Sequence, residues 1–532
     1  MISVPCGSVV NGHDSNSLNS RQPSIETLAD AEKFFMSALE LNIDKTSIKD
    51  IRQACLGIAL IKSFQTSLGK VSKNNSRLAA TYLDLGSAVT LRRELLEVID
   101  NKLSHSESRN DMDWPGIDQL NQIKSLSPHK RNSKRLFIPS PSPLGSPMHE
   151  SENLFNEDLS INKYWEDIKS RHLREFNNPE EGLVETINQL PNNYSVISIS
   201  ITDDKKTMFV VKFRKNSEPL LVSLPLDNRQ NKREGGGEEG AFTYRDAIDE
   251  LQSIIEESDK SIKSASDGQV ITDDDKVDWW NCRKHLDSRM RQFVKNIEFC
   301  WLGVFKSLFL KPTAKSENAL NGLRGCLEKV FKRHIHSNGR KRLNSKVKLD
   351  DALLECFSAL QTNCKDEELE DLIYFVLDIH GFHGIQLALA EIDIDQATVD
   401  IRSALEEYSN KFSDDNQVED DQHTFIILDK MTQTMPWESI PTLRNQSVSR
   451  IPSIGFLRDR MDLIKHLHQD KFYVNPKKTF CLINPSGDLK RTQKNFEGWF
   501  TKLKEIGWKG ITGREPLEVE IANALETNDL FM

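Results

Sequence analysis

The sequence predicts an α+β protein of several domains: a helical, solenoid-like N-terminal part, a central region with a meander and a long helical insert, and the start of an α/β domain. Three observations support this prediction. Apolar residues recur at helical spacing throughout 25–103. Ile197, Ile199 and Ile201 alternate with hydroxyl side chains, as in a strand with one buried face. Residues 424–428 are a continuous β-branched and aromatic run, which is typical of a strand buried on both faces in a parallel sheet.

Composition and pattern divide the chain into consecutive parts. These are 1–24, disordered; 25–103, helical and solenoid-like; 104–158, a disordered Ser-Pro linker; 159–412, a central domain with a three-stranded meander and a long helical insert; 413–422, an acidic linker; and 423–532, the incomplete N-terminal part of an α/β domain. At roughly 100–200 residues per domain, a chain of 532 residues has room for this arrangement.

The overall composition is that of a soluble, intracellular protein. Hydrophobic residues make up 37% and charged residues 28%, and the net charge of −10 argues against general affinity for nucleic acid. No apolar run approaches the ~18 residues of a membrane span, and the N-terminus lacks the features of a signal peptide. The cysteines are scattered without a C-x-x-C pair, which favours reduced thiols. We expect no membrane association, no direct nucleic-acid site and no cofactor.

The helical part, 25–103, has small residues where helices are expected to cross. They are Ala38, Ala54, Gly57, Ala59, Ala79 and Ala80. This pattern resembles the last turns of a tetratricopeptide-type solenoid, although the strict repeat signature is absent, and a plain helical bundle is the alternative. Residues 1–24 are rich in Ser, Asn and Gly, which predicts disorder.

The linker, 104–158, has a composition that cannot bury enough apolar surface to offset the entropy of ordering. Its Ser-Pro steps are candidate phosphorylation sites: Ser127, Ser140, Ser142 and Ser146. Ser127 is followed by Pro and has Lys130 at the third position beyond it, which fits a cyclin-dependent kinase. Each phosphate would add about −1.5 to −2 charges and so reverse the charge of a basic segment. Alternatively, these steps are ordinary features of a disordered linker.

In the central domain, 159–412, a first strand-like run begins at about residue 194, and two further runs follow it after short turns. This pattern predicts a three-stranded antiparallel meander with one buried face. Amphipathic helices follow from about 243 to 412. One of them, near Trp279 and Trp280, is roughly thirty residues long and exceeds the usual ~11–12, so it must pack against other helices.

The last part, 423–532, alternates buried strands with amphipathic helices. Strands are expected at 424–428 and 479–483, and a helix at 492–506. An apolar strand begins at 529–532, so we expect the domain to be incomplete in this chain.

The connection after the first of these strands, 435–453, is punctuated by Pro436, Pro441 and Pro452 and is therefore expected to be a fixed, irregular loop. Loops at the carboxyl ends of parallel strands are where α/β folds carry their chemistry. Glu438 in this loop has two interpretations, an acid in a site or a residue that caps or salt-bridges the loop, and we favour the second.

Other candidate sites are incomplete. His380 and His383 are three residues apart across a Gly, and no Cys joins them, so no metal site is predicted. The glycines at 235–237 lack the strand-then-helix context of a phosphate-binding loop. No cysteine lies beside a Gly at a strand exit, where a caspase-type nucleophile is expected. The sequence shows no complete catalytic set.

The loop and its surroundings resemble separase, a family of caspase-like cysteine endopeptidases. The motifs that carry the resemblance are L-D-K at 428–430, M-P-W-E-S-I-P at 435–441 and V-S-R-I-P-S at 448–453, with F-C-L-I-N-P at 480–485 and G-W-K-G at 507–510 in support. The meander and the helical insert are also similar, so the resemblance covers roughly 190–532 and, more loosely, the helical N-terminal part.

The resemblance implies that 159–412 is a pseudo-protease (substrate) domain with a helical insert and that 423–532 begins a caspase-like protease domain. In the family, the catalytic His lies in Y-x-G-H-G after a strand of the N-D-L-F-M kind, and the nucleophilic Cys lies in G-C-x-S. Neither motif occurs here. We therefore assign no catalytic residue, expect that pair beyond Met532, and expect the chain by itself to be inactive. Trp437, Glu438, Arg450 and Pro452 occupy the loop motif and are expected to shape the domain.

The resemblance also implies a substrate and partners. The substrate is the kleisin subunit of cohesin, cleaved after the Arg of a D/E-x-x-R site at anaphase; securin is the inhibitor, and the location is cytoplasm and nucleus, with spindle and chromosomes in mitosis. The match at Asp488–Arg491 makes Arg491 a candidate self-cleavage site, with chance occurrence as the alternative. The rival function is a non-enzymatic scaffold or pseudo-protease that binds a regulatory partner.

Overall fold

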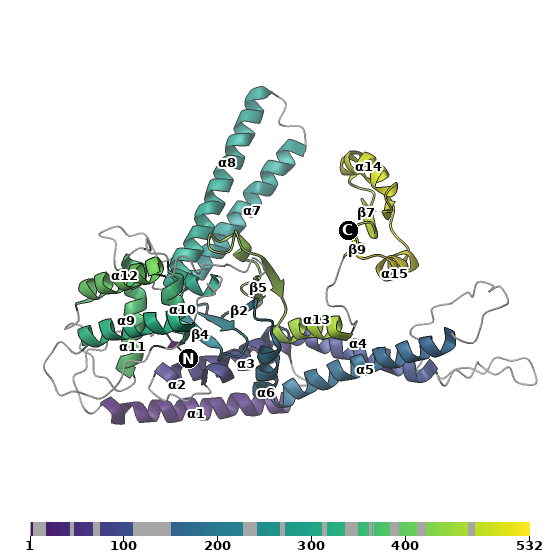
Figure 1. Ribbon diagram of the computed structural model, residues 1–532. Helices are drawn as coiled ribbons and strands as arrows, with labels where there is room; N and C mark the ends of the chain where they lie inside the picture. The colour runs from purple at the N-terminus through teal and green to yellow at the C-terminus, as the bar shows by residue number, and fades with distance from the viewer. Residues whose placement is uncertain are drawn as a thin grey trace, which may run out of the picture. The chain divides into compact units, whose positions relative to one another are not determined.

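The computed structural model has two compact units, one up to Arg458 and one from Asp459, and confirms the α+β class (Figure 1). The described residues are 2–3, 17–42, 47–67, 75–109, 150–226, 242–266, 272–310, 317–335, 349, 351–360, 364, 366–382, 393–411, 422–466 and 474–532. No helix in these ranges is both long and apolar enough to cross a bilayer.

The N-terminal helices pack in sequence order, α1 on α2 and α2 on α3. They are α1 (Ser17–Asn42), α2 (Ile48–Ser67), α3 (Asn75–Ser87) and α4 (Val89–Arg109). Small residues permit the crossings. A Cβ on Gly57, one of the residues expected at a crossing, would lie 2.9 Å from the Phe35 ring, and a Cβ on Gly86, which was not among them, would lie 3.0 Å from Cys55 Cβ. The prediction of disorder for 1–24 needs correction, because α1 begins within it.

Helices also extend into both ends of the predicted linker. Helix α4 ends at Arg109, and α5 (Glu150–Asn177) begins before residue 158, so 104–158 is not linker throughout. Helix α5 packs against α4 and α6 (Pro179–Gln189). The four Ser-Pro sites lie outside the described residues.

The main sheet has the order β1-β4-β3-β2-β5-β6. Its strands are β1 (Ile2–Ser3), β2 (Tyr194–Ile201), β3 (Thr207–Phe213), β4 (Leu220–Pro225), β5 (His423–Leu428) and β6 (Val448–Ile451). The antiparallel pairs β2–β3 and β3–β4 confirm the meander, and β5 pairs in parallel with both β2 and β6. The buried parallel strand predicted at 424–428 is thus confirmed.

The meander is buried on both faces, although one buried face was predicted. Ile197 and Ile199 face the core of the helical insert, while Ser198 and Ser200, at 1% and 3% exposure, are covered as well. Helix α3 contacts β2 and β4 and so covers the second face. Small hydroxyl side chains that look solvent-exposed in sequence are here the residues that let a helix pack closely on the sheet.

The boundary expected at 413–422 does not separate two domains in the structure. Strand β5, which follows it, lies in one sheet with the meander that precedes it, and the division between compact units falls between Arg458 and Asp459. A buried parallel strand requires a partner on each side, and β2 supplies one of them.

The helical insert lies between β4 and β5 in sequence. Its elements are α7 (Tyr244–Ser266), α8 (Asp273–Asn296), a π turn (Ile297–Leu302), a 3₁₀ turn (Gly303–Phe309), α9 (Glu317–Ile335), α10 (Asp351–Ala359), α11 (Asp366–Phe382) and α12 (Ile394–Lys411). The long predicted helix is α8, and it begins earlier than Trp279 because Thr272 and Asp275 form a capping box. The insert and one face of the sheet share a single large apolar core.

The second unit holds a parallel three-stranded sheet, β8-β7-β9. Its elements after α13 (Ile454–His466) are β7 (Thr479–Ile483), α14 (Lys490–Lys504), β8 (Lys509–Thr512), α15 (Glu518–Thr527) and β9 (Leu530–Phe531). The strands expected at 479–483 and 529–532 and the helix between them are confirmed. Its core is small: Cys481, Ile483 and Phe500, with Trp508 packed against them.

Candidate functional site

Asp429 ends β5 and ties it to the neighbouring strand. The Ile201 amide donates to Asp429 Oδ2 at 2.9 Å, and the amides of Met431 and Thr432 donate to Oδ1 at 2.9 and 2.8 Å. Burial raises the pKa of this carboxyl above its ordinary value. In the sequence, Asp429 is noted only as part of the L-D-K motif. An Asp directly after a buried strand is nevertheless a signal that its side chain accepts hydrogen bonds from the backbone amides of the following turn.

Trp437 fixes the loop from inside. Its side chain is fully buried, and the indole Nε1–H donates to the Thr432 carbonyl at 2.9 Å. Its ring centroid lies 6.4 Å from that of Trp301 in the helical insert. A tryptophan with a satisfied N–H inside an apolar core positions its loop and leaves no free group for chemistry.

Glu438 and Arg450 form a clamp across the loop. Arg450, on β6, donates from Nη2 to Glu438 Oε2 at 2.7 Å, and also to the carbonyls of Gln433 (2.6 Å) and Met435 (2.9 Å). The Arg450 guanidinium lowers the pKa of Glu438. A carboxyl held ionised in this way is poorly suited to donate a proton, so the geometry fits the ion-pair interpretation of Glu438.

Pro452 lies where the loop enters α13. The Pro452 carbonyl accepts a hydrogen bond from Ser87 Oγ at 3.3 Å. The first residue of α13 is capped by a residue of α3, because the Ile454 amide donates to Asp84 Oδ1 at 2.9 Å. Burial raises the pKa of Asp84 to about 6. Asp84 could not be identified from the sequence because no local motif surrounds it. It caps α13 only because α3 packs against the loop.

The second candidate region is the carboxyl end of β7. From β7 the chain runs through α14 to β8 on one side, and then through α15 to β9 on the other, so β7 lies at a topological switch point. In open α/β sheets, ligands bind at the carboxyl ends of strands at such a point. By this rule, the carboxyl end of β7 is the candidate position for a site in the second unit.

The turn after β7 is held in an unusual conformation. Asn484 has φ 52° and Gly487 has φ 74°, a region in which non-glycine residues are uncommon. The Leu489 amide donates to Asn484 Oδ1 and Asn484 Nδ2 donates to Gln493 Oε1, both at 2.9 Å. Two hydrogen bonds from one side chain therefore fix the backbone at the switch point, a pattern found at functional turns.

The described residues around this turn contain no nucleophile set up for catalysis. Cys481 lies within β7, and burial raises the pKa of its thiol, which disfavours the reactive thiolate. Arg491 lies exposed in the first turn of α14, so the match at Asp488–Arg491 begins in a loop and ends in a helix. Nor do the described residues bring together three potential metal ligands anywhere.

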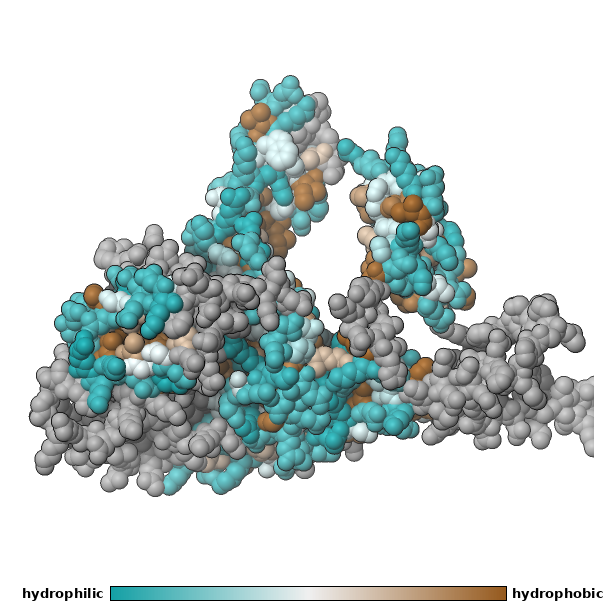
Figure 2. All heavy atoms as spheres, viewed as in Figure 1, coloured by the Kyte–Doolittle hydropathy of each residue, from teal (hydrophilic) through white to brown (hydrophobic). Residues whose placement is uncertain are grey.

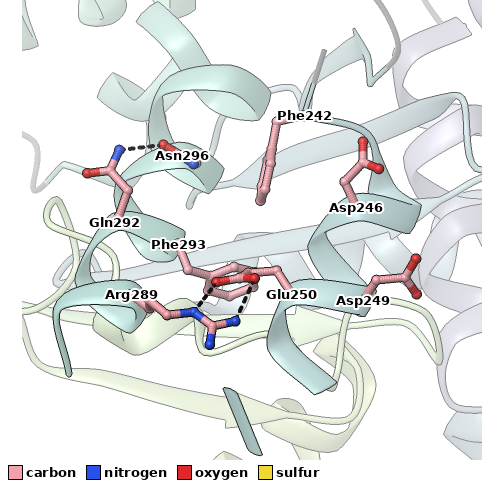
Figure 3. A pocket seen from close by; sticks show the side chains of 8 residues that line it. All are labelled: Phe242, Asp246, Asp249, Glu250, Arg289, Gln292, Phe293 and Asn296. Carbon is pink, nitrogen blue, oxygen red and sulfur yellow. Dashed lines mark hydrogen bonds and ion pairs between the residues drawn. The ribbon is translucent and has the colours of Figure 1, made fainter. Parts of the chain in front are cut away.

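A cleft of about 570 Å³ lies at the base of the α7–α8 pair (Figure 3). Its walls carry Asp246, Asp249 and Glu250 together with Arg289. In Figure 3 the Arg289 guanidinium points at Glu250, and the two groups form a 2.9 Å ion pair. This ion pair connects the two helices, and the cleft's described lining contains no Ser, Thr or Cys nucleophile.

Comparison with known proteins points to one family. The family model "Separin, protease domain" matches residues 203–532. Separin from Schizosaccharomyces pombe is 36% identical over 351 residues (65% of this chain, 18% of that protein), and separin from Emericella nidulans is 32% identical over 357 residues (65% and 17%). The chain thus spans less than a fifth of the length of these curated relatives.

A solved structure shows the same fold. The Saccharomyces cerevisiae separase in its crystallised complex with securin superimposes with a TM-score of 0.63 at 20% identity, covering 96% of this chain and 29% of that one. The helical part, the six-stranded sheet with its insert and the small parallel sheet therefore belong to one known architecture.

Proposed function

This chain belongs to the separin protease family, and we propose that it forms the substrate domain and the first strands of the protease domain of a cysteine endopeptidase that cleaves the kleisin subunit of cohesin at anaphase. The observation that carries the proposal is the family match over 203–532, which includes both the clamped loop and the β7–β9 sheet. The described geometry supports it, since the loop residues hold the first unit together and the switch point provides a place for the reaction.

In this proposal, a His activates a Cys thiolate that attacks the carbonyl carbon after an Arg, and backbone N–H groups hold the oxyanion. Neither catalytic motif occurs in this sequence, so the chain's own contribution is structural. By the general rule for open α/β sheets, those groups would act near the carboxyl end of β7, where Asn484 fixes the turn. We therefore propose that the chain alone does not hydrolyse the substrate.

Securin is the proposed inhibitor, and the support for it is the likeness to a separase that was crystallised with securin. Cyclin-dependent kinase is the proposed regulator through Ser127 and the neighbouring Ser-Pro steps, because phosphate would reverse the charge of that basic segment. The proposed location, cytoplasm and nucleus, follows from the proposed substrate.

The proposal is tested in two steps. The purified chain is incubated with a fluorogenic kleisin peptide that contains a D/E-x-x-R site, and no cleavage is expected; cleavage after the Arg would contradict the proposed inactivity. The transcript is then sequenced beyond the codon for Met532. A frame that continues into G-H-G and G-C-x-S motifs, and whose product cleaves the peptide but not an Arg→Glu version, is the expected result. A stop codon there would favour the scaffold function.

A further inference from the structure

Strand β4 of the main sheet has β3 on one side and the short strand β1 on the other (Figure 1). Strand β1 has two residues, and the parallel register pairs Ile2 with Val222 and Ser3 with Ser223. Among the residues that the structure describes, no other strand pairs with this side of β4. Most of the length of β4 therefore has no described strand partner along its outer edge.

The residues of this edge are buried. Leu221, Val222 and Leu224 are at most 1% exposed, and Ser223 is 7% exposed. Backbone N–H and C=O groups at such positions have little access to bulk water, so they need hydrogen-bond partners within the protein. A buried strand edge of this kind favours the addition of another strand.

The pairing of β4 with β3 determines which backbone groups face the outer edge. The Leu226 amide, at the end of β4, donates to the Lys206 carbonyl at 2.8 Å. Because alternate residues of an antiparallel strand bond to the same neighbour, the even-numbered residues of β4 turn their backbone groups toward β3. The odd-numbered residues, Leu221, Ser223 and Pro225, turn theirs toward the outer edge, and among them proline has no N–H to donate.

A strand added at this edge lies between two walls of the first unit. Val222 and Leu224 belong to the large core that the sheet shares with the helical insert. On the other face of the sheet, α3 contacts β4 and α2 contacts β1. Paired residues of neighbouring strands share a face, so a residue opposite Val222 faces the insert and a residue opposite Ser223 faces α2. An apolar residue suits the first position, and a small residue suits the second.

Recognition at this edge depends on the backbone more than on an apolar surface. Figure 2 shows mainly hydrophilic side chains on the visible face of the described first unit, with hydrophobic ones scattered among them. Segments that add to a sheet edge obtain their affinity from main-chain hydrogen bonds, and the pockets for alternate side chains provide specificity. The outward groups of Leu221 and Ser223 supply the first requirement, and the two walls supply the second.

Strand β1 is a weak occupant of this edge. It has two residues, whereas strands usually have about 3–10, and parallel pairing is slightly less stable per residue than antiparallel pairing. Its place on the same chain raises its effective concentration at the edge. A separate segment that pairs with more of β4 forms more hydrogen bonds and can therefore replace β1.

We propose that the outer edge of β4 is a docking site for an extended, uncharged segment of a partner protein, which displaces β1 and pairs in parallel with β4. The segment carries an apolar residue opposite Val222 and a small residue opposite Ser223, the order in which Ile2 and Ser3 pair there. It is uncharged because a charge between the two buried walls would lose its water without gaining a partner. The proposal concerns the main sheet alone and goes beyond the proposed function.

The test opens the edge in the full chain. Ile2 lies opposite Val222, so its backbone groups turn toward the outward groups of β4, and those of Ser3 turn away. Ile2→Pro therefore removes an N–H that the pairing needs, whereas the control Ser3→Pro does not. A fluorescein-labelled peptide, Gly-Ser-Met-Ile-Ser-Val-Gly-Ser, is titrated by fluorescence anisotropy. The Ile2→Pro chain should bind it saturably. The unchanged chain and Ser3→Pro should bind about three- to thirtyfold more weakly, because β1 must first be displaced.

Modified peptides test the backbone pairing on the Ile2→Pro chain. An N-methyl group on the peptide's Ile blocks an N–H that faces β4 and should weaken binding at least about tenfold. An N-methyl group on its Ser faces away and should change binding by less than about threefold. A peptide with Glu in place of the Ile should bind at least about tenfold more weakly, since the charge would be buried without a partner.

Two proline variants, each combined with Ile2→Pro, place the site on β4. Ser223→Pro removes an outward N–H and leaves the bonds to β3 in place, so the peptide should bind at least about tenfold more weakly. Lys215→Pro is the matched control in the β3–β4 turn, where proline is favoured before Asn216 with its φ of 55°. This control should bind the peptide within about twofold of Ile2→Pro alone.

Several results would overturn the proposal. One is the absence of saturable binding to Ile2→Pro, and another is equal binding of the two N-methylated peptides, which need no change in β4 and so decide the matter even if Ser223→Pro unfolds. If the unchanged chain binds no peptide at a hundredfold excess over the Kd of Ile2→Pro, β1 is a fixed strand and no partner displaces it. Sedimentation should show a monomer. A dimer that Ile2→Pro abolishes would assign the edge to the N-terminal strand of a second copy.

Discussion

At the scale of single residues, the loop motif at 435–453 has a structural role in the first unit. Trp437 and Arg450 are predicted from the sequence to shape the domain, and their N–H groups donate to the backbone carbonyls of Thr432, Gln433 and Met435. Glu438 is paired with Arg450. The motif therefore marks a loop whose backbone carbonyls need side-chain donors, because no strand or helix satisfies them.

We expect the two members of this clamp to contribute unequally. The side chains of both are more than a third exposed, so solvent screens the ion pair and its contribution is only ~0–1 kcal/mol. Arg450→Ala also removes the donors to two carbonyls, which costs about 1–3 kcal/mol. Hydrogen exchange at Trp437–Ser439 should therefore accelerate strongly in Arg450→Ala and weakly in Glu438→Gln. Equal acceleration would show that the ion pair, and not the carbonyl contacts, holds the loop.

Asp84 gives stability a defined pH dependence. Burial raises its pKa from 3.8 to about 6, so the folded state holds a proton that the unfolded state has released in that range. The ionised, buried form is disfavoured, and Asp84's contribution to stability falls as the pH rises from about 4 to 6. Burial lowers the pKa of the nearby His172 from 6.5 to about 3. Its effect on stability has the opposite sign: as the pH falls below about 6.5, the unfolded chain binds a proton at this imidazole that the folded chain does not, so the folded state loses stability.

Asp84→Asn keeps an oxygen for the Ile454 amide and removes the buried charge. We expect a gain in stability at pH 7 of up to about 3 kcal/mol, at roughly 1.4 kcal/mol per pKa unit, that shrinks toward zero at pH 4. Urea unfolding at the two pH values measures it. Asp84→Ala is the control, since it leaves the amide without its acceptor: it should lose about 1–3 kcal/mol at pH 4, and at pH 7 it should be less stable than Asp84→Asn by about the same amount. A gain in Asp84→Asn that is the same at pH 4 and 7 would contradict this account.

At the scale of elements, the small parallel sheet of the second unit depends on one glycine. A Cβ at Gly510 in β8 would lie 2.1 Å from the Cys481 carbonyl oxygen and 2.8 Å from Phe500. Since that oxygen belongs to the neighbouring strand, it has nowhere to move without breaking the β7–β8 ladder. The absence of a side chain is what allows this sheet and its helix to approach so closely.

Two glycine substitutions should therefore have opposite effects. Gly510→Ala is expected to destabilise the sheet by roughly 3 kcal/mol or more, because backbone and core both clash. Gly498→Ala, within α14 and with open space around it, should stabilise by about 0.5–1 kcal/mol. Hydrogen exchange in β7 reports both, and exchange in β3 should not change. A Gly510→Ala chain with normal protection in β7 would show that the close contact relaxes easily.

At the scale of the whole molecule, the two units differ greatly in how much they bury. The first has a large core that joins the helical insert to the six-stranded sheet and a separate core among its N-terminal helices, whereas the described core of the second consists of Cys481, Ile483 and Phe500 with Trp508 at its edge. The large side chains of Phe496 and Trp499 on α14 remain 50% and 45% exposed. Full burial of an apolar side chain contributes about 1.5–3 kcal/mol to stability, and these two residues of the second unit gain only part of that contribution.

The sequence by itself determined the elements and the family. Period and composition depend on neighbours along the chain, so the meander, the buried run at 424–428, the long α8 helix and the strands β7 and β9 were predictable, whereas the short strand β8 was not predicted. The loop motif could likewise be recognised from the sequence, because its residues follow one another in short runs along the chain. The Ser-Pro sites and the role of Arg491 stay predictions.

Only the tertiary structure decided how these elements combine. It placed β5 beside β2, covered Ser198 and Ser200 with a helix, and brought Asp84 to the start of α13. It also put Ile262 and Trp280 on the outside of the α7–α8 pair and Ser261 between the two helices. Each of these depends on a partner hundreds of residues away or on the direction in which a helix turns its side chains, and local periodicity carries no information about either.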